Sequence, residues 1–287
     1  MVINVIFRGF NFSQDGPGNR LVYHLQGCNL HCPWCSNPES MAENGCLLVN
    51  GDLSEDLCPF GAIKEGTLNR NRCETCSDKP CTKIPGSTLK LSCTGIEIED
   101  ILAEIKRSSM LFFDGGGVTF TGGEPTMQFD ALKELLTRIK AMGINTAVET
   151  NGTHIQLPEL FPFIDFLIID CKHYYGIIHE KTLGIGSEII LKNINKALEQ
   201  RSQLLIRIPL IGGFNSAKSD AEGFAKLFER MNTENCAFEL LRYHEYGKDK
   251  WAQCGYEYKM ENANVSDNDF NEFCKVFEAH SLKLIRT

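Results

Sequence analysis

The sequence predicts an α/β protein folded as a partial (β/α)6 barrel of the TIM type, with a small cysteine-rich insert. Six strand-like segments alternate mostly with amphipathic helices, and such alternation produces right-handed βαβ units and a parallel sheet. Six units are too few to close an eight-stranded barrel, so one side should stay open. Residues 40–95 break the alternation, because they are rich in Cys, Gly, Asn and Pro and lack long apolar periodicity. The predicted divisions are therefore the start of the barrel at 1–39, the insert at 40–95 and the rest of the barrel at 96–287.

The strands are short apolar segments that end near glycines or polar residues. They are expected at 20–28, 117–124, 145–152, 166–172, 204–210 and 238–244. The helices are segments in which apolar residues recur at helical spacing. They are expected at 98–106, 129–142, 187–200, 219–232 and 266–280. Ser187, Ser219 and Ser266 would cap the starts of the last three helices, and Gly143 would follow the end of the second.

The composition excludes some classes of protein. The chain has 287 residues, of which 43% are hydrophobic and 23% are charged, an ordinary globular composition. Its net charge of −8 makes it a poor candidate for binding nucleic acid or an anionic membrane by electrostatic attraction. No apolar run approaches the roughly 18 residues of a membrane span, and the first residues do not resemble a signal peptide. We therefore expect a soluble, cytoplasmic protein with neither a nucleic-acid nor a membrane partner.

The cysteines indicate metal. There are 13 of them, and nine lie between Cys28 and Cys93. In a reducing compartment, closely spaced thiols point to metal ligands rather than to disulfides. The later cysteines are isolated, and we expect them to be buried and unreactive; they are Cys171, Cys236, Cys254 and Cys274.

The most informative motif is Cys28-x3-Cys32-x2-Cys35, at the end of the first expected strand of the barrel. Three thiolates can hold one face of a 4Fe–4S cube, which normally takes four cysteines. The iron without a cysteine then has an open position, and an open position on a metal is where a substrate binds. A zinc site that also uses His31 is the alternative, but the strand-end context of the thiols argues against it.

This spacing, with the aromatic residue Trp34 directly before the third cysteine, resembles the signature of the radical S-adenosylmethionine (SAM) family. Further segments resemble those of the activating enzymes of glycyl radical enzymes, of the pyruvate formate-lyase activating enzyme type. In order, they are DGPG at 15–18, GGGVTFTGGEP at 115–125, ETNG at 149–152, DCKH at 170–173, RIPLIGGFN at 207–215 and LLRYHEYGKDKW at 240–251. Several short segments in the right order are far more specific than any one of them.

The resemblance implies an enzyme that reductively cleaves SAM, held on the open iron of a 4Fe–4S cluster, to methionine and a 5′-deoxyadenosyl radical. That radical would abstract a glycine Cα hydrogen from a partner glycyl radical enzyme, with reduced flavodoxin or ferredoxin as the electron donor. One alternative is another radical SAM reaction, on a peptide or a small molecule. The other is a non-catalytic iron–sulfur electron carrier, which would leave the GGEP, ETNG and DCK segments without a purpose.

The resemblance also implies a role for each matched residue. The catalytic set would be Cys28, Cys32 and Cys35 as ligands of the SAM cluster, with Lys172 near the SAM carboxylate. The other SAM contacts would be Trp34 at the adenine, Gly122, Gly123, Glu124 and Glu149 at the methionine amino group, and Thr150, Asp170 and His244 near the ribose. The amino-acid end of SAM is zwitterionic, so it needs both an acidic and a basic partner in a closed site. Asp15 would face the glycyl loop of the partner. In the family, the positions matching Glu149, Thr150, Ile168 and Asp170 can also hold a monovalent cation.

The insert resembles a ferredoxin-like module with some ligands lost. Such inserts hold two clusters on eight cysteines, and this one has six: Cys46, Cys58, Cys73, Cys76, Cys81 and Cys93. In the ferredoxin arrangement, a Cys before Pro ligates the cluster of the other half, and Cys58 occupies such a position. We expect one auxiliary 4Fe–4S cluster on Cys58, Cys73, Cys76 and Cys81. Cys93 in place of Cys58 is the alternative ligand set, and a four-cysteine zinc site fits the same thiols.

Overall fold

The computed structural model describes residues 1–200 and 203–286 of the chain. Its centre is an eight-stranded sheet with the strand order β12-β11-β10-β9-β8-β2-β1-β7. The strands are β1 (Val2–Phe12), β2 (Asn19–Leu25), β7 (Thr94–Glu97), β8 (Gly117–Gly122), β9 (Asn145–Thr150), β10 (Phe166–Asp170), β11 (Leu204–Leu210) and β12 (Cys236–Arg242). Neighbours from β2 to β12 pair in parallel, and they are the six predicted strands.

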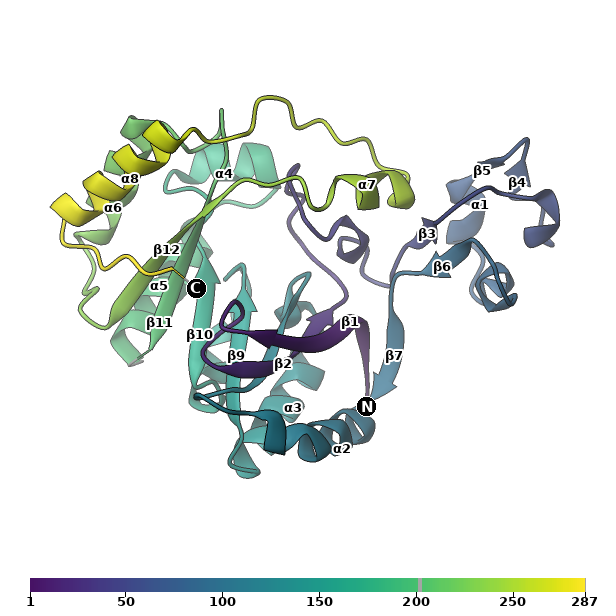
Figure 1. Cartoon of the computed structure of the whole chain (residues 1–287), viewed down its shortest axis with the longest axis horizontal. Helices are drawn as coiled ribbons and strands as arrows, with labels where there is room; N and C mark the ends of the chain where they lie inside the picture. The colour runs from purple at the N-terminus through teal and green to yellow at the C-terminus, as the bar shows by residue number, and fades with distance from the viewer. Residues whose placement is uncertain (201–202, 287) are drawn as a thin grey trace.

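The sheet curves but does not close, as Figure 1 shows. Its two edge strands are β12 and β7, and β1 is antiparallel to both β2 and β7. The outer side of β12 is covered at one point by the end of the chain, where Phe238 bridges to Leu284. The α/β class and the partial barrel are therefore confirmed.

The five predicted helices form on the outside of this sheet. They are α2 (Ile98–Ser108), α3 (Phe129–Ala141), α5 (Glu188–Gln200), α6 (Lys218–Phe228) and α8 (Asp267–Ala279). Each buries one apolar stripe; α3, for example, buries Leu132, Leu135 and Ile139 in the main core. Ser266 caps α8, accepting a hydrogen bond from the Asp269 amide at 3.1 Å. The prediction for Ser219 is wrong, because α6 begins one residue earlier and its N-cap is Ala217.

Outside the lobe, the sequence pattern did not predict four of the described α-helices and strands. They are β1, β7, α4 (Gly176–Leu183) and α7 (Lys248–Cys254). Only the first half of β1 alternates between buried and partly exposed residues, and β7 is a four-residue edge strand. Short 3-10 helices complete this part of the fold: η1 (Pro38–Ser40), η4 (Ser109–Leu111), η5 (Pro125–Gln128) and η6 (Leu157–Phe163). No helix among the described residues has the length and apolarity to cross a bilayer.

A small lobe projects from the barrel between β2 and β7 (Figure 1). It contains β3 (Leu47–Val49), η2 (Glu55–Leu57), β4 (Ile63–Lys64), β5 (Thr67–Leu68), α1 (Arg70–Glu74), η3 (Pro80–Lys83) and β6 (Leu89–Leu91). Its own cluster of buried apolar residues is limited to Leu47, Ile63, Cys81 and Leu89. So small a core contributes little stability, and metal binding could supply additional folding free energy.

Candidate functional site

A cavity of about 660 Å³ lies at the carboxyl ends of the parallel strands. This volume is within the range of roughly 300–1,000 Å³ that small-molecule sites occupy. Nearly all the predicted site residues line it: Asp15, Cys28, Cys32, Trp34, Cys35, Gly122, Gly123, Glu149, Thr150, Asp170, Lys172 and His244. The strands bring these residues together because parallel strands end at the same edge of a sheet.

The three cysteines lie on the loop after β2, packed against the apolar side chains of Leu30 and Leu183. Burial raises the pKa of each of the three thiols to about 12. Thiolates in such a place need a strong positive partner, and a metal centre is one. The donor set therefore fits an iron–sulfur cluster. The alternative ligand His31 is exposed and is not among the lining residues.

The loop that carries the cysteines is tied to the end of β8. The amide of Gly123 donates to the Leu25 carbonyl at 2.9 Å, and the amide of Glu124 donates to the Gly27 carbonyl at 2.7 Å. A Cβ on Gly123 would lie only 2.3 Å from that Gly27 oxygen, so no other residue fits without displacing the loop. Only glycine, which has no Cβ, allows the two backbones to approach this closely.

Glu124 is the one predicted SAM contact that does not line the cavity. Its fully buried carboxylate accepts hydrogen bonds from the Thr150 hydroxyl at 2.7 Å and from the Asn151 amide at 2.6 Å. It also accepts from the Thr126 amide at 3.0 Å. The side chain thus braces the ends of β8 and β9 against each other. Burial raises the pKa of this carboxyl, although these hydrogen bonds oppose the rise.

Lys172 and Asp170 form an ion pair on the cavity wall. Burial disfavours the Lys172 ammonium, but the carboxylate of Asp170 and the nearby Cys32 thiol outweigh this effect and raise the lysine pKa. The lysine therefore stays charged beside the cysteine loop. A charged lysine on this wall could pair with a carboxylate in the cavity.

Arg207, on β11, is a charged residue of the cavity wall that the sequence argument missed. Its guanidinium donates to Glu149 at 2.6 Å and to Glu239 at 2.7 Å, and it is only 5% exposed. It also donates to the Gln14 carbonyl, beside Asp15. Burial disfavours a charged Glu149, but Arg207 outweighs this and lowers the pKa of Glu149. The available signal was an arginine inside the otherwise apolar strand LLIRIPL.

Asp15 and His244 line the cavity on loops outside the strands. Burial, and then repulsion by Glu149, raises the pKa of Asp15, which accepts a hydrogen bond from the Asn11 amide at 2.5 Å. The exposed His244 ring stacks on Tyr246 with their centroids 4.2 Å apart. Trp34 packs against Phe214 with a centroid separation of 4.8 Å.

The four positions that could hold a monovalent cation are already engaged. Glu149 pairs with Arg207, Asp170 pairs with Lys172, and the Thr150 hydroxyl donates to Glu124. Ile168 is fully buried. A cation at these positions would have to exchange with these partners.

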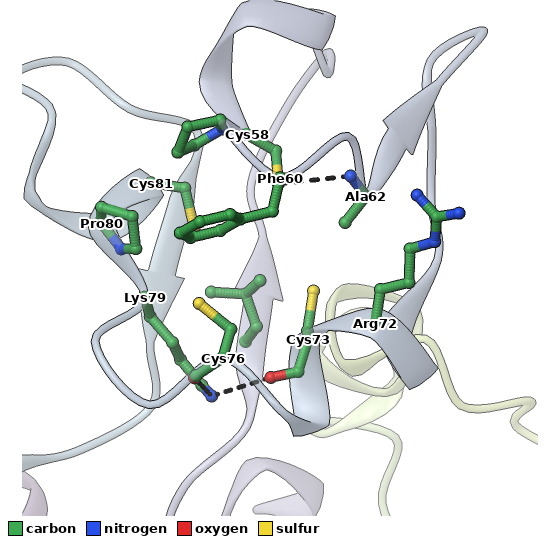
Figure 2. A pocket seen from close by; sticks show the side chains of 11 residues that line it. Cys58, Phe60, Ala62, Arg72, Cys73, Cys76, Lys79, Pro80 and Cys81 are labelled. Atoms are coloured by element: carbon green, nitrogen blue, oxygen red, sulfur yellow. Dashed lines mark hydrogen bonds between the residues drawn. The ribbon is translucent and has the colours of Figure 1, made fainter.

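Four cysteines of the lobe surround a second, smaller pocket, which Figure 2 shows from close by. They are Cys58, Cys73, Cys76 and Cys81. Phe60 also lines the pocket, and the Lys79 ammonium donates to the carbonyls of Cys73 and Cys76 at 3.2 and 3.0 Å. Cys93 does not line this pocket; its sulfur packs against Gly45 instead. Among the described residues, no group of three or more His, Cys, Asp or Glu side chains is arranged to hold a single metal ion. Four thiols around one pocket are the number of ligands that a 4Fe–4S cluster takes.

The fold and the site define a radical SAM protein. The chain belongs to the radical SAM superfamily, whose family model matches residues 22–227. Membership implies a 4Fe–4S cluster and SAM, in agreement with the three thiols on the cavity wall.

The relatives place the chain among the activating enzymes of this superfamily. It is 31% identical to the 4-hydroxyphenylacetate decarboxylase activating enzyme of Clostridioides difficile (strain CD196), over 95% of this chain and 92% of the relative. It is 33% identical to the choline trimethylamine-lyase activating enzyme of Oleidesulfovibrio alaskensis, over 89% of this chain and 88% of the relative. The structure is also similar to that of QueE from Escherichia coli, with a TM-score of 0.53 and 16% identity over 99% of this chain and 93% of that one. This last likeness concerns the fold alone.

Proposed function

We propose that this chain activates a glycyl radical enzyme by cleaving SAM and removing a hydrogen atom from a backbone glycine of that partner. The observation that carries the proposal is the composition of the cavity wall. Three thiols from one loop line it together with the basic Lys172 and the acidic Glu149, which lie at the ends of strands. The relatives, named as activating enzymes of a decarboxylase and of a lyase, support a protein as the substrate.

Cys28, Cys32 and Cys35 would hold the 4Fe–4S cluster. When bound, the cluster would supply the electron for reductive cleavage of SAM to methionine and a 5′-deoxyadenosyl radical, and that radical would take the glycine hydrogen. The apolar side chains of Leu30 and Leu183 pack around the thiols and would help to keep water away from the bound cluster.

The charged residues would orient SAM. The Lys172 ammonium would bind its carboxylate, in exchange for part of the ion pair with Asp170. Glu149 would face the SAM ammonium, and Arg207 keeps this carboxylate ionised. A zwitterion held at both ends has one preferred orientation, which positions the bond to be broken.

The partner's glycyl loop would reach SAM from the open side of the barrel. Asp15, His244 and Tyr246 line the cavity there, and the last two are exposed. We propose Asp15 as a contact of the loop backbone, because it lines the cavity on the loop between β1 and β2.

The lobe, with limits at 40–95, would hold one auxiliary 4Fe–4S cluster on Cys58, Cys73, Cys76 and Cys81, and reduced flavodoxin or ferredoxin would supply electrons. The pocket of Figure 2 supports Cys58 over Cys93 as the fourth ligand. Iron analysis of the reconstituted protein tests this ligand set. Cys58→Ala should lose bound iron and Cys93→Ala should not; equal iron in the two variants would contradict the ligand set, and zinc in place of iron would contradict the cluster.

The experiment that tests the main proposal measures two products under strictly anaerobic conditions with a strong reductant. The reconstituted protein should form 5′-deoxyadenosine from SAM, and Cys35→Ala should not. Cys274→Ala is the matched control, because this half-buried thiol lies outside both pockets. Addition of a partner glycyl radical enzyme should then yield a stable radical in its electron paramagnetic resonance spectrum. 5′-Deoxyadenosine without a radical on any glycyl radical enzyme would favour a different substrate.

A further inference from the structure

Two cysteines outside both proposed metal sites meet between the lobe and the barrel. Cys46 directly precedes β3, and Cys254 is the last residue of α7. Their Sγ atoms lie 3.5 Å apart, although 208 positions separate them in the sequence. Cys254 is buried, as expected, but it is isolated only in the sequence and not in space. The sulfur atoms of a disulfide are about 2.05 Å apart, so small side-chain rotations would bring this pair into bonding distance.

The surroundings of the pair favour Cys46 as the sulfur that reacts first. Cys46 is half-buried, whereas Cys254 is only 1% exposed. The pKa of Cys46 is lowered mainly by its hydrogen bond with Cys254, and the positive charge of Arg70 lowers it further. Arg70 also fixes both chain segments, because it donates to the Leu47 carbonyl at 2.5 Å and to the Gln253 carbonyl at 2.8 Å.

The helix that carries Cys254 connects the lobe to the loop of the SAM cluster. At one end, α7 contacts β3 of the lobe, beside which it lies in Figure 1. Along its length, the Trp251 indole donates to the Cys35 carbonyl at 2.9 Å, and Lys250 forms an ion pair with Glu39 at 2.8 Å. A bond at Cys254 would therefore act on an element that supports the cluster loop.

We propose that Cys46 and Cys254 form a reversible disulfide on reaction with a low-molecular-weight disulfide such as oxidised glutathione, and that this bond clamps α7 to the lobe. In the first step, the Cys46 thiolate attacks one sulfur of glutathione disulfide and releases a glutathione thiolate. In the second step, Cys254 loses its proton and its sulfur attacks the Cys46 sulfur, releasing the second glutathione. The two protein thiols lose two electrons, glutathione disulfide gains them, and excess reduced glutathione reverses both steps.

Peptide mapping of the reconstituted protein tests this proposal. The protein is equilibrated anaerobically with glutathione buffers, so that oxygen does not attack the clusters, and is then alkylated and cleaved after glutamate. Cys46 is then the only cysteine of peptide 44–55, and Cys254 is the only one of peptide 246–257. We expect these two peptides to be linked in oxidising buffer and separate again in reducing buffer, while the bound iron stays constant.

The variants separate this link from other reactions. Cys46→Ser and Cys254→Ser should each abolish it, and Cys274→Ser should leave it unchanged. A link from Cys46 to peptide 75–97, which contains Cys93, would overturn the proposal. So would glutathione adducts alone, or a link that forms only as iron is lost.

Hydrogen exchange tests the consequence for the helix. Amide exchange in residues 248–254 should slow on oxidation in the wild type but not in Cys254→Ser. Unchanged exchange in a fully linked protein would overturn the clamping of α7.

Discussion

Replacing Arg207 with methionine tests whether one buried cation organises the acidic wall of the cavity. The substitution keeps the length and apolar packing of the side chain but removes the charge between Glu149 and Glu239. Those two carboxylates lie 2.6 and 2.7 Å from the guanidinium, and Arg207 and Glu239 are almost completely buried.

Removing one partner of a buried ion pair destabilises a protein by about 3–5 kcal/mol, because the remaining charge is left uncompensated. We therefore expect Arg207→Met to lower the free energy of unfolding by about that amount at neutral pH. For a domain of this size, the thermal midpoint should fall by about 5–15 °C.

The loss should depend on pH in a defined direction. In the wild type, Arg207 lowers the pKa of Glu149, so its contribution to stability is present above the usual glutamate pKa and is lost as the pH falls through the folded value. In the variant, burial acts on Glu149 without that opposition and raises its pKa. Glu149 will then protonate at a higher pH, so the difference between the two proteins should shrink as the pH is lowered.

Anaerobic thermal denaturation, followed by circular dichroism across a range of pH, measures both effects. Lys133→Met is the control, because its ion pair with Glu159 is exposed and should contribute only about 0–1 kcal/mol. Adding Glu149→Gln to Arg207→Met should recover part of the stability, since it removes an unpaired charge. A loss in Arg207→Met no larger than in Lys133→Met, or one that grows at low pH, would refute the reasoning.

Two other substitutions test the backbone and the charge of the site. Gly123→Ala should greatly reduce the iron bound after reconstitution, because the new Cβ would lie 2.3 Å from the Gly27 oxygen. The control is Gly143→Ala, whose new Cβ has no atom within 4 Å and which should retain full iron. Equal iron in both variants would contradict this account. Lys172→Met should weaken SAM binding by roughly 10–100-fold, the value of one charge-assisted hydrogen bond, as measured by calorimetry on the reconstituted protein; a dissociation constant within error of the wild type would exclude Lys172 as the carboxylate partner.

Most of the fold could be predicted from the sequence because its signals are local. The parallel strands are buried on both faces, so they are continuous apolar segments such as 204–210, and the helices between them have one apolar stripe. The strand β1 was missed because only its first half alternates between buried and exposed residues. The strand β7 was missed because it is short and its pairing partner, β1, lies far away in the chain. Val2 pairs with Glu97, and nothing near either residue in the sequence indicates the other.

The sequence by itself determined the chemistry of the site wherever the spacing is short. Cys28, Cys32 and Cys35 lie on one loop, so their convergence needs no long-range contact. Residues at the ends of parallel strands could also be grouped in advance, because the strand direction alone brings Asp170 and Lys172 to the same edge as the cysteines.

Only the tertiary structure decided which distant residues touch. Strand register places Arg207 opposite Glu239, and the curvature of the sheet brings Glu149 within reach of the same guanidinium. Packing of the lobe selects Cys58 over Cys93 for the second pocket, and packing of α7 brings Cys254 to Cys46. Such contacts depend on how separate elements are placed in space, and a one-dimensional pattern of apolar and polar residues does not contain that placement.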